Sequence, residues 1–199
     1  PVSIAWIALT CGSWYSLWVN GVLVNHGPPR EVAPWQYYDT ADLSACLATG
    51  PNRLRIRAYH LGVDTQSHAA CLAGLMVAGE IAGAHWRIDL GCRSHWRAAR
   101  SPAFLRGAPR LFACLGFGEH ADLRENTDDW LVRPADASWK TPSVVAQHPL
   151  PGREQLIPAD LPAFSGEMKE AELLHETEAW QVWDFGGVVF GFLELRSEQ

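Results

Sequence analysis

The amino-acid sequence predicts an all-β chain in which a β-sandwich is followed by a linker and by part of a second β domain. The first observation is Asn20-Gly21 between two apolar stretches, because this pair tolerates the positive φ angles of a type I′ hairpin turn. The second is the alternation of apolar residues and arginines over residues 53–59, which is typical of a half-buried strand. Since a hairpin needs a wider sheet, and that sheet needs a second layer, these observations favour a sandwich.

The hairpin is expected to span residues 14–27, with a register set by its turn. This register places three pairs of residues opposite each other: Val19 and Val22, Leu17 and Val24, and Tyr15 and His26. Ser16 and Asn25 would then lie together on the other face. The sequence therefore predicts one mostly apolar face for the hairpin.

The remaining strands are predicted from short apolar or alternating runs bounded by turn residues. They are residues 4–10, 35–39, 53–59, 71–81, 86–90 and 111–115. In residues 53–59 we expect Leu54, Ile56 and Ala58 to point inward. Residues 39–43 are expected to form one helical turn, and Trp130, Trp139 and Val144-Val145 a last strand pair.

Proline content divides the chain. Four prolines between residues 149 and 162 indicate an extended connector, so residues 1–148 are assigned to the sandwich and 149–178 to a linker. An acidic segment at 167–175 is expected to be a short helix within this linker. Residues 179–199 are apolar on both faces and are interpreted as the first strands of an incomplete second β domain.

Composition excludes several classes of protein. A net charge of −6 disfavours nucleic acid as a partner, and no run approaches the roughly 18 apolar residues that a membrane span needs. The five cysteines are widely spaced and odd in number, so we interpret them as buried thiols. With no signal peptide in the first residues, the cysteines favour the cytoplasm.

An acidic stretch is the first candidate site. It contains five carboxylates and one amide: Glu119, Asp122, Glu125, Asp128, Asp129 and Asn126. Such oxygen ligands could bind Ca²⁺, with Asp122, Asn126 and Asp128 as its ligands, or accept hydrogen bonds from sugar hydroxyls. A solvated acidic loop and a glycosidase acid/base pair formed by Glu119 and Asp122 are the alternatives.

Three of the ten tryptophans form the second candidate site. Trp14, Trp18 and Trp35 flank the hairpin and the Gly27-Pro28-Pro29 corner, where exposed rings could stack on sugars. Packing in the core is the alternative for each ring.

Other motifs are weaker. Residues 116–121 match G-x-G-x-x-A, but the carboxylates that follow disfavour a dinucleotide. Cys92 and His95, with His60, His68 and His85, lack the ligand pairs of a zinc site. The arginines of residues 87–110 are expected to form salt bridges or to face another domain.

The order of motifs resembles that of a known enzyme family. Residues 15–21, 27–30, 37–43 and 50–54 are similar to the jelly-roll sandwich ahead of the catalytic domain in large glycoside hydrolases. Residues 118–124, Trp130, Trp139-Lys140 and residues 184–191 are similar to the N-terminal region of bacterial α-L-rhamnosidases.

This resemblance implies a galactose-binding-like jelly-roll sandwich that serves as a non-catalytic accessory module. It implies that the catalytic residues lie in a downstream barrel domain, which would be the partner of this chain, and that none lies here. It also implies a rhamnose-containing glycan as ligand, with calcium assisting in some relatives and with Glu119, Asp122 and Arg124 matching the acidic-loop motif. The alternatives are a purely structural interdomain module and a stand-alone glycosidase using Glu119 and Asp122.

Overall fold

The computed structural model describes residues 2–66, 68–91, 95–112, 114–122, 124–125, 128–161, 167–189, 191 and 193, with only the backbone of Asp128. The chain divides into two compact units, Pro1–Asp160 and Leu161–Gln199. Within the described residues, no helix has the length and apolar character needed to cross a membrane.

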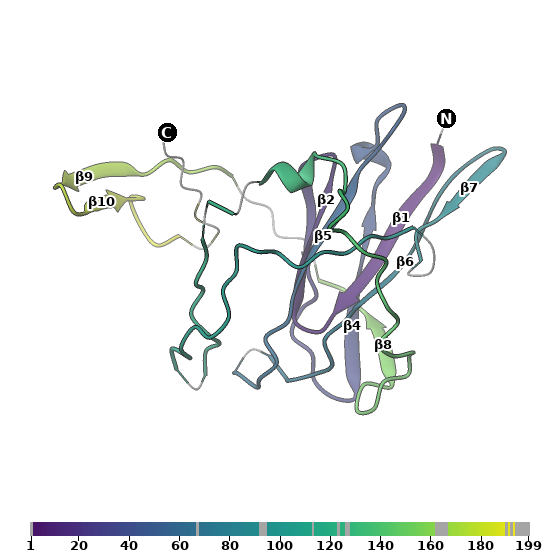
Figure 1. Cartoon of the computed structure of the whole chain (residues 1–199), viewed down its shortest axis with the longest axis horizontal. Coiled ribbons are helices and arrows are strands. Elements are labelled where there is room, and N and C mark those ends of the chain that lie inside the picture. Colours follow the sequence, from purple (N-terminus) through teal and green to yellow (C-terminus); the bar gives the residue numbers. More distant parts are fainter. Residues whose placement is uncertain are drawn as a thin grey trace. The chain divides into compact units, whose positions relative to one another are not determined.

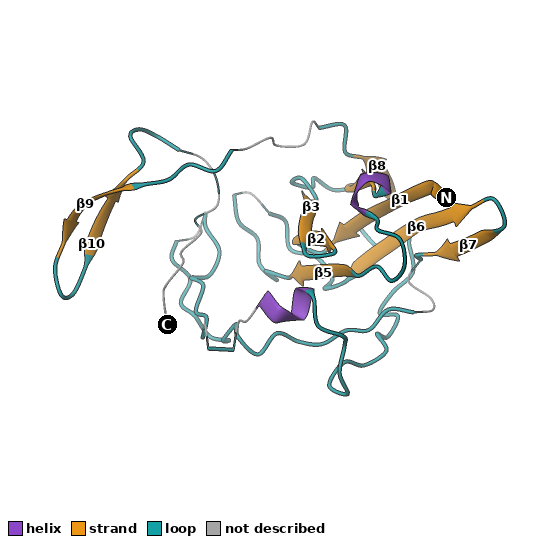
Figure 2. Cartoon of the chain, turned by 90° about the horizontal axis from the view of Figure 1, so that it is seen from above, coloured by secondary structure: helices purple, strands orange, loops and turns teal. Residues whose placement is uncertain are grey.

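The first unit contains two sheets (Figures 1 and 2). The larger has the order β7 (Trp86–Asp89), β6 (Leu75–Gly83), β1 (Val2–Cys11), β4 (Trp35–Asp42) and β8 (Gln155–Pro158). The smaller has the order β3 (Val22–Gly27), β2 (Trp14–Val19) and β5 (Leu54–Tyr59). The described helices are two 3₁₀ turns, η1 (Ser44–Cys46) and η2 (Asp128–Leu131). The predicted all-β sandwich is confirmed.

Alternating side chains of β1 and β2 build the core. Ile7 and Leu9 of β1 and Leu17 and Val19 of β2 are at most 1% exposed, as expected when every second residue of a strand points inward. Burying each contributes about 1.5–3 kcal/mol. Leu54 and Ile56 pack against this core as predicted. Ala58, also predicted to point inward, is exposed near the end of β5, an edge strand of its sheet.

The hairpin turn lies where the sequence predicts it. Asn20 and Gly21 have φ angles of 52° and 84°, and Val19 pairs with Val22. The predicted register continues for one more pair and is wrong beyond it. Trp18 pairs with Leu23 and Leu17 with Asn25, so Val24 is an additional residue in β3. This bulge shifts the remaining pairs by one residue, and Ser16 therefore faces His26 rather than Asn25.

Two asparagines, Asn20 and Asn52, connect the hairpin turn to the turn that precedes β5. Asn20 Nδ2 donates to Asn52 Oδ1 at 2.8 Å and to the Cys46 carbonyl at 3.0 Å. The Arg53 amide donates to Asn20 Oδ1 at 2.9 Å. The motifs around residues 20 and 52 thus form one hydrogen-bonded corner of the sandwich.

Most of the helical turn predicted at residues 39–43 is instead the end of β4, and the turn itself follows in η1, which closes at Leu47. Leu9 pairs with Asp39, and Trp6 with Asp42, so pairing with β1 determines the conformation. Inside the sandwich, the Tyr15 hydroxyl donates to Asp39 Oδ2 at 2.7 Å. Burial raises the pKa of Asp39, and the hydrogen bond from Tyr15 opposes this effect.

Two further strand predictions are wrong. The described residues of 103–122 form a loop joined by isolated bridges, and Leu111 and Leu115 are 67% and 56% exposed instead of lying in a buried strand. Trp130, Trp139 and Val144-Val145 form no strand pair, because Trp130 is in η2 and the two valines are exposed.

Trp130 nevertheless packs on the outer face of the smaller sheet. Its ring meets Trp18 edge-on at 5.5 Å, and its carbonyl accepts a 2.9 Å hydrogen bond from Arg55 Nε. The Arg55 guanidinium also lies 5.5 Å from the centre of the Trp139 ring. Residues 128–140 therefore cover this face, as the sequence predicts, but without a strand.

The segment predicted as a linker contains β8, which pairs in parallel with β4 and closes the first unit. Trp35 Nε1 donates to Gln155 Oε1 across this pair at 3.0 Å. In the second unit, β9 (Glu172–Glu176) and β10 (Gln181–Asp184) form an antiparallel hairpin. The helix predicted at 167–175 is therefore wrong: residues 167–171 have no regular structure, and pairing with β10 makes residues 172–176 extended.

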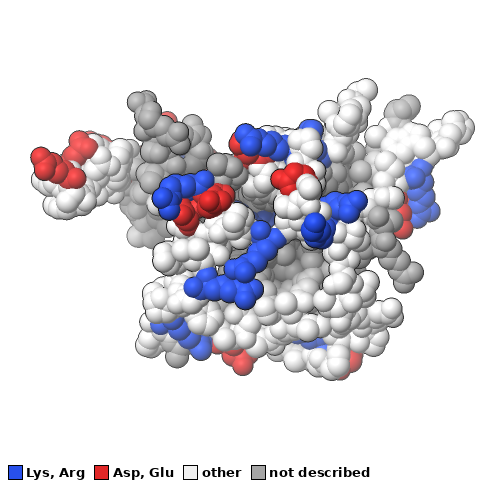
Figure 3. All heavy atoms as spheres, viewed as in Figure 1, with Lys and Arg blue, Asp and Glu red and all other residues white. Residues whose placement is uncertain are grey.

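Charged and thiol side chains differ in part from the predictions. Within residues 87–110, one described ion pair joins Arg87 to Glu80 at 3.0 Å, whereas Arg110 donates to the carbonyls of Asp64 and Leu115. Figure 3 shows basic and acidic atoms adjacent at several places on one face. The four described cysteines are unpaired, but Cys114 is exposed, so the expectation of five buried thiols is wrong.

Candidate functional site

Two stacked aromatic rings form the most developed candidate site. Trp14 of β2 pairs with Tyr59 of β5, and their ring centres lie 4.7 Å apart with 24° between the planes. Direct cross-strand pairing places such rings in contact. The side chains remain 37% and 38% exposed. This ring pair offers an apolar surface of the kind that stacks on the C–H face of a sugar.

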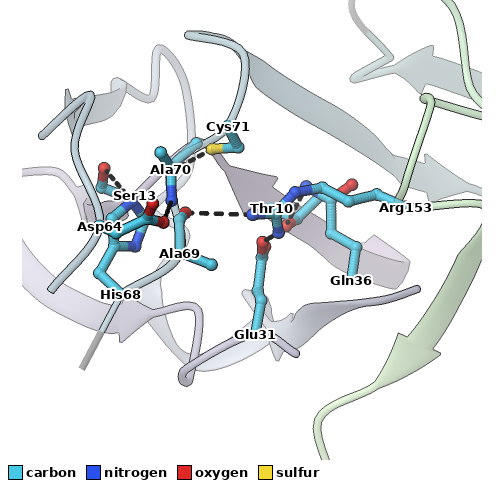
Figure 4. A network of polar contacts seen from close by, with 11 residues as sticks. Thr10, Ser13, Glu31, Gln36, Asp64, His68, Ala69, Ala70, Cys71 and Arg153 are labelled. Carbon is cyan, nitrogen blue, oxygen red and sulfur yellow. Dashed lines mark hydrogen bonds and ion pairs between the residues drawn. The ribbon is translucent and has the colours of Figure 1, made fainter. Parts of the chain in front are cut away.

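A buried polar pair lies beside the rings. His68 meets Trp14 edge-on at 6.1 Å, and its Nε2 lies 3.1 Å from Ser13 Oγ (Figure 4). The Leu61 amide donates to Ser13 Oγ at 2.8 Å, so the Ser13 hydroxyl can donate to the histidine. Ser13 and His68 are only 6% and 7% exposed. The pair is therefore suited to fix the position of Trp14 and not to meet a substrate.

The same pair makes stability depend on pH. Burial, followed by the charge of nearby His60, lowers the pKa of His68 from its ordinary value of 6.5. Below that pH the unfolded chain takes up the proton before the folded chain does, so the free energy of unfolding falls as the pH falls. We expect this loss between about pH 7.5 and about pH 5.5 in urea unfolding.

Two variants separate this contribution from others. His68→Gln should reduce the difference in unfolding free energy between the two pH values. Part of the difference should remain in this variant, because burial also lowers the pKa of His26. His85→Gln, in the exposed turn between β6 and β7, is the control for loss of a histidine outside the core. An equal difference in wild type and His68→Gln would contradict this account.

Glu119 belongs to the neighbourhood of the ring pair. Burial raises the pKa of Tyr59, and the negative charge of Glu119 raises it further. Glu119 is exposed. An exposed carboxylate beside an aromatic surface can accept hydrogen bonds from hydroxyls of a stacked ligand.

Asp122 and Arg124 interact with each other. Arg124 donates to Asp122 Oδ1 from Nε at 2.8 Å and to Oδ2 from Nη2 at 2.6 Å. These hydrogen bonds lower the pKa of Asp122. Because a guanidinium occupies both carboxylate oxygens, Asp122 does not fit the role of a calcium ligand.

The rest of the predicted calcium site cannot be located. Asn126 and the Asp128 side chain lie outside the described residues. The described residues contain no group of three or more histidine, cysteine or acidic side chains that could hold a metal ion. Cys92, from the weak zinc pattern, is also outside them.

The other two predicted tryptophans lie away from the ring pair. Trp18 is half-buried between Trp130 and the Arg57 guanidinium, which lies 5.1 Å from its ring centre. Trp35 is 41% exposed and lies on the larger sheet. The structure therefore does not bring the three tryptophans together.

Two residues of the site were missed. Tyr59 ends the alternating run that predicted β5, so its place opposite Trp14 required the pairing of β2 with β5. His68 is in a loop, where no sequence period marks a contact 55 residues away with Ser13. Both residues depend on long-range pairing that local patterns do not encode.

The fold defines the class of this chain, a β-sandwich domain, and one comparison relates it to part of a solved enzyme structure. The chain is similar to part of a GH78 family rhamnosidase from Bacillus sp. GL1, with 28% sequence identity and a TM-score of 0.70. The match covers 82% of this chain and 17% of that one, and it confirms the resemblance to a rhamnosidase. No family model matches the chain, and the search of curated proteins gives no match.

Proposed function

We propose that this chain is a non-catalytic accessory module of an α-L-rhamnosidase-like glycoside hydrolase and that it helps to hold rhamnosyl glycans. The similarity to a 17% portion of a rhamnosidase carries this proposal. The parent protein would supply the catalytic domain, with which this module associates. The Trp14–Tyr59 ring pair, with Glu119 nearby, supports the sugar-binding part of the proposal.

The sugar-binding part predicts a response at Trp14. During titration with methyl α-L-rhamnopyranoside, the indole N–H signal of Trp14 should shift in ¹H–¹⁵N spectra, because the sugar stacks on the ring pair. Trp14→Ala identifies this signal and should weaken binding at this site about tenfold or more. Trp86→Ala, at an exposed ring of β7, is the matched control and should retain the response.

The titration is repeated with CaCl₂ and with EDTA. The pairing of Asp122 with Arg124 leads us to expect the same affinity in both conditions. No shift at Trp14 at any millimolar sugar concentration would overturn the ring pair as a binding site. A shift that requires CaCl₂ would instead restore the calcium-assisted hypothesis.

The stand-alone glycosidase remains the enzymatic alternative. Asp122 is held by Arg124, and Glu119 is exposed. We therefore expect no turnover of an aryl α-L-rhamnoside by this chain. Turnover that is abolished by Glu119→Gln would contradict the accessory role.

One observation favours the purely structural module. Trp18, one of the three candidate tryptophans, contacts Trp130 and Arg57 of the chain itself, which partly cover its ring. A module that only supports its catalytic partner would leave the rhamnoside titration without any response. The experiment with Trp14 therefore distinguishes this function from glycan binding.

A further inference from the structure

The outer face of the larger sheet carries an exposed tryptophan between two carboxylates. Trp6 of β1 pairs with Glu80 of β6 on one side and with Asp42 of β4 on the other. Paired residues of antiparallel strands point to the same face, and adjacent strands lie about 4.8 Å apart. Ala5 and Ile7, the neighbours of Trp6, are 5% and 0% exposed. Trp6 therefore points away from the core, and it is 38% exposed.

One row of residues beside Trp6 contains Ile4, which is 46% exposed, and the row on its other side contains only small side chains. Ala8 is flanked by Ala78 of β6 and by Thr40 of β4. Ala78 and Thr40 are exposed, and Ala8 is half-buried. These small side chains leave space beside the Trp6 indole, so the ring of a ligand can approach the indole.

Both carboxylates keep hydrogen-bond acceptor sites for a ligand. Asp42 Oδ1 accepts a 2.8 Å hydrogen bond from the Ser44 amide, and the Ser44 contacts lower the pKa of Asp42. Glu80 Oε2 accepts the ion pair from Arg87 at 3.0 Å. Each carboxylate oxygen offers two acceptor sites, so the contacts with Ser44 and Arg87 leave acceptor sites open on both groups. Two charge-assisted acceptors thus flank one aromatic surface.

We propose that this face is a second glycan-binding surface, on which Trp6 stacks against a neutral pyranose while Asp42 and Glu80 accept hydrogen bonds from its hydroxyls. The inference rests on the proposed function in one respect, that the chain holds glycans, but it uses none of the residues around Trp14. Because both acceptors are negative, the surface favours a neutral sugar over a uronate.

The polar groups argue for a sugar rather than an apolar protein surface as the occupant. An apolar cover would take the open acceptor sites of Asp42 and Glu80 out of water without replacing their hydrogen bonds. A pyranose presents C–H groups to Trp6 and hydroxyls to both sides at once. Its chemistry matches the order of acceptor, aromatic ring and acceptor across the three strands.

The test follows the Trp6 indole N–H signal in ¹H–¹⁵N spectra, with methyl α-L-rhamnopyranoside as the probe. We expect the signal to shift at millimolar sugar and Trp6→Ala to weaken binding at this face about tenfold. Asp42→Asn should weaken it about threefold or more, since it removes one charged acceptor. Trp86→Ala, whose ring is 44% exposed but lies opposite Gly83, should have no effect. A methyl glucuronide should bind more weakly than the rhamnoside.

The outcomes distinguish this inference from the proposed function. A response at Trp14 with none at Trp6 overturns the second surface and leaves the accessory role in place. If neither tryptophan signal shifts, the second surface and the proposed glycan binding are both overturned. A Trp6 signal that moves with protein concentration and not with sugar shows that the face binds another copy of the chain, and it also overturns the inference. Melting temperatures of Trp6→Ala and wild type confirm that the variant is folded.

Discussion

Replacing Gly79 by alanine should destabilise the sandwich by about 3 kcal/mol. Gly79 lies in β6 opposite Ile7 of β1, the central strand of the larger sheet. A Cβ atom at this position would lie 2.6 Å from the Trp6 carbonyl oxygen and 2.9 Å from Ile7 Cα. Both are backbone atoms of a paired strand, so they cannot move aside without disturbing the hydrogen bonds between strands.

Urea unfolding followed by tryptophan fluorescence measures this effect. Gly74→Ala is the matched control, because its Cβ would meet only the Val145 side chain, at 3.5 Å. We expect the control to change the free energy of unfolding by less than about 0.5 kcal/mol. If the two variants unfolded at the same urea concentration, the close approach of β6 to β1 would be contradicted.

Removing one partner of the buried ion pair between Glu31 and Arg153 should have an effect of similar or larger size. The two residues are 5% and 6% exposed, and they point toward each other in Figure 4. Arg153 also donates from Nη2 to the Ala69 carbonyl at 3.1 Å. Glu31→Ala leaves this guanidinium buried without its counter-charge, which costs about 3–5 kcal/mol.

The control for this prediction is an exposed pair. Arg133 and Asp129 form an ion pair with 72% and 45% of their side chains exposed, so Asp129→Ala should cost less than about 1 kcal/mol. The double variant Glu31→Leu/Arg153→Met should recover much of the stability lost in Glu31→Ala, because no charge is then left buried. Equal stability of Glu31→Ala and wild type would show that the pair is open to water.

Arg153 also explains why the linker prediction misses a strand. Prolines at 149, 151, 158 and 162 indicate an extended segment, and β8 is extended, as the prolines suggest. The pairing of β8 in the sheet depends on β4, which lies more than 100 residues earlier. It also depends on the contact between Arg153 and Glu31. Local composition cannot encode such a partner.

In the hairpin, the sequence predicts the turn but not the bulge in β3. Asn20-Gly21 specifies the turn because few residues tolerate its φ angles, and the alternation of residues 54–56 specifies a core-facing strand. The bulge at Val24 follows from packing across the sheet and leaves no mark in a two-residue period. The predicted pairs beyond the first were therefore wrong by one residue.

The candidate site divides in the same way. Trp14 and Glu119 could be proposed from residue type alone, because exposed aromatic rings and carboxylates are the usual contacts of sugars. Tyr59 and the Ser13–His68 pair became visible only once β2 and β5 were paired and the loop after β5 was placed. Trp6 was predicted as part of a strand, but its two flanking carboxylates come from strands whose pairing with β1 the sequence does not reveal.

Affinity electrophoresis tests most directly whether this chain holds rhamnosyl glycans without cleaving them. The chain is run through native gels with and without a rhamnose-rich polysaccharide, and the polysaccharide is then analysed for released sugar. We predict slower migration in the polysaccharide gel, weaker retardation for Trp14→Ala, full retardation for Trp86→Ala, and no released rhamnose. Equal migration in both gels, or rhamnose released by the chain alone, would contradict the proposal.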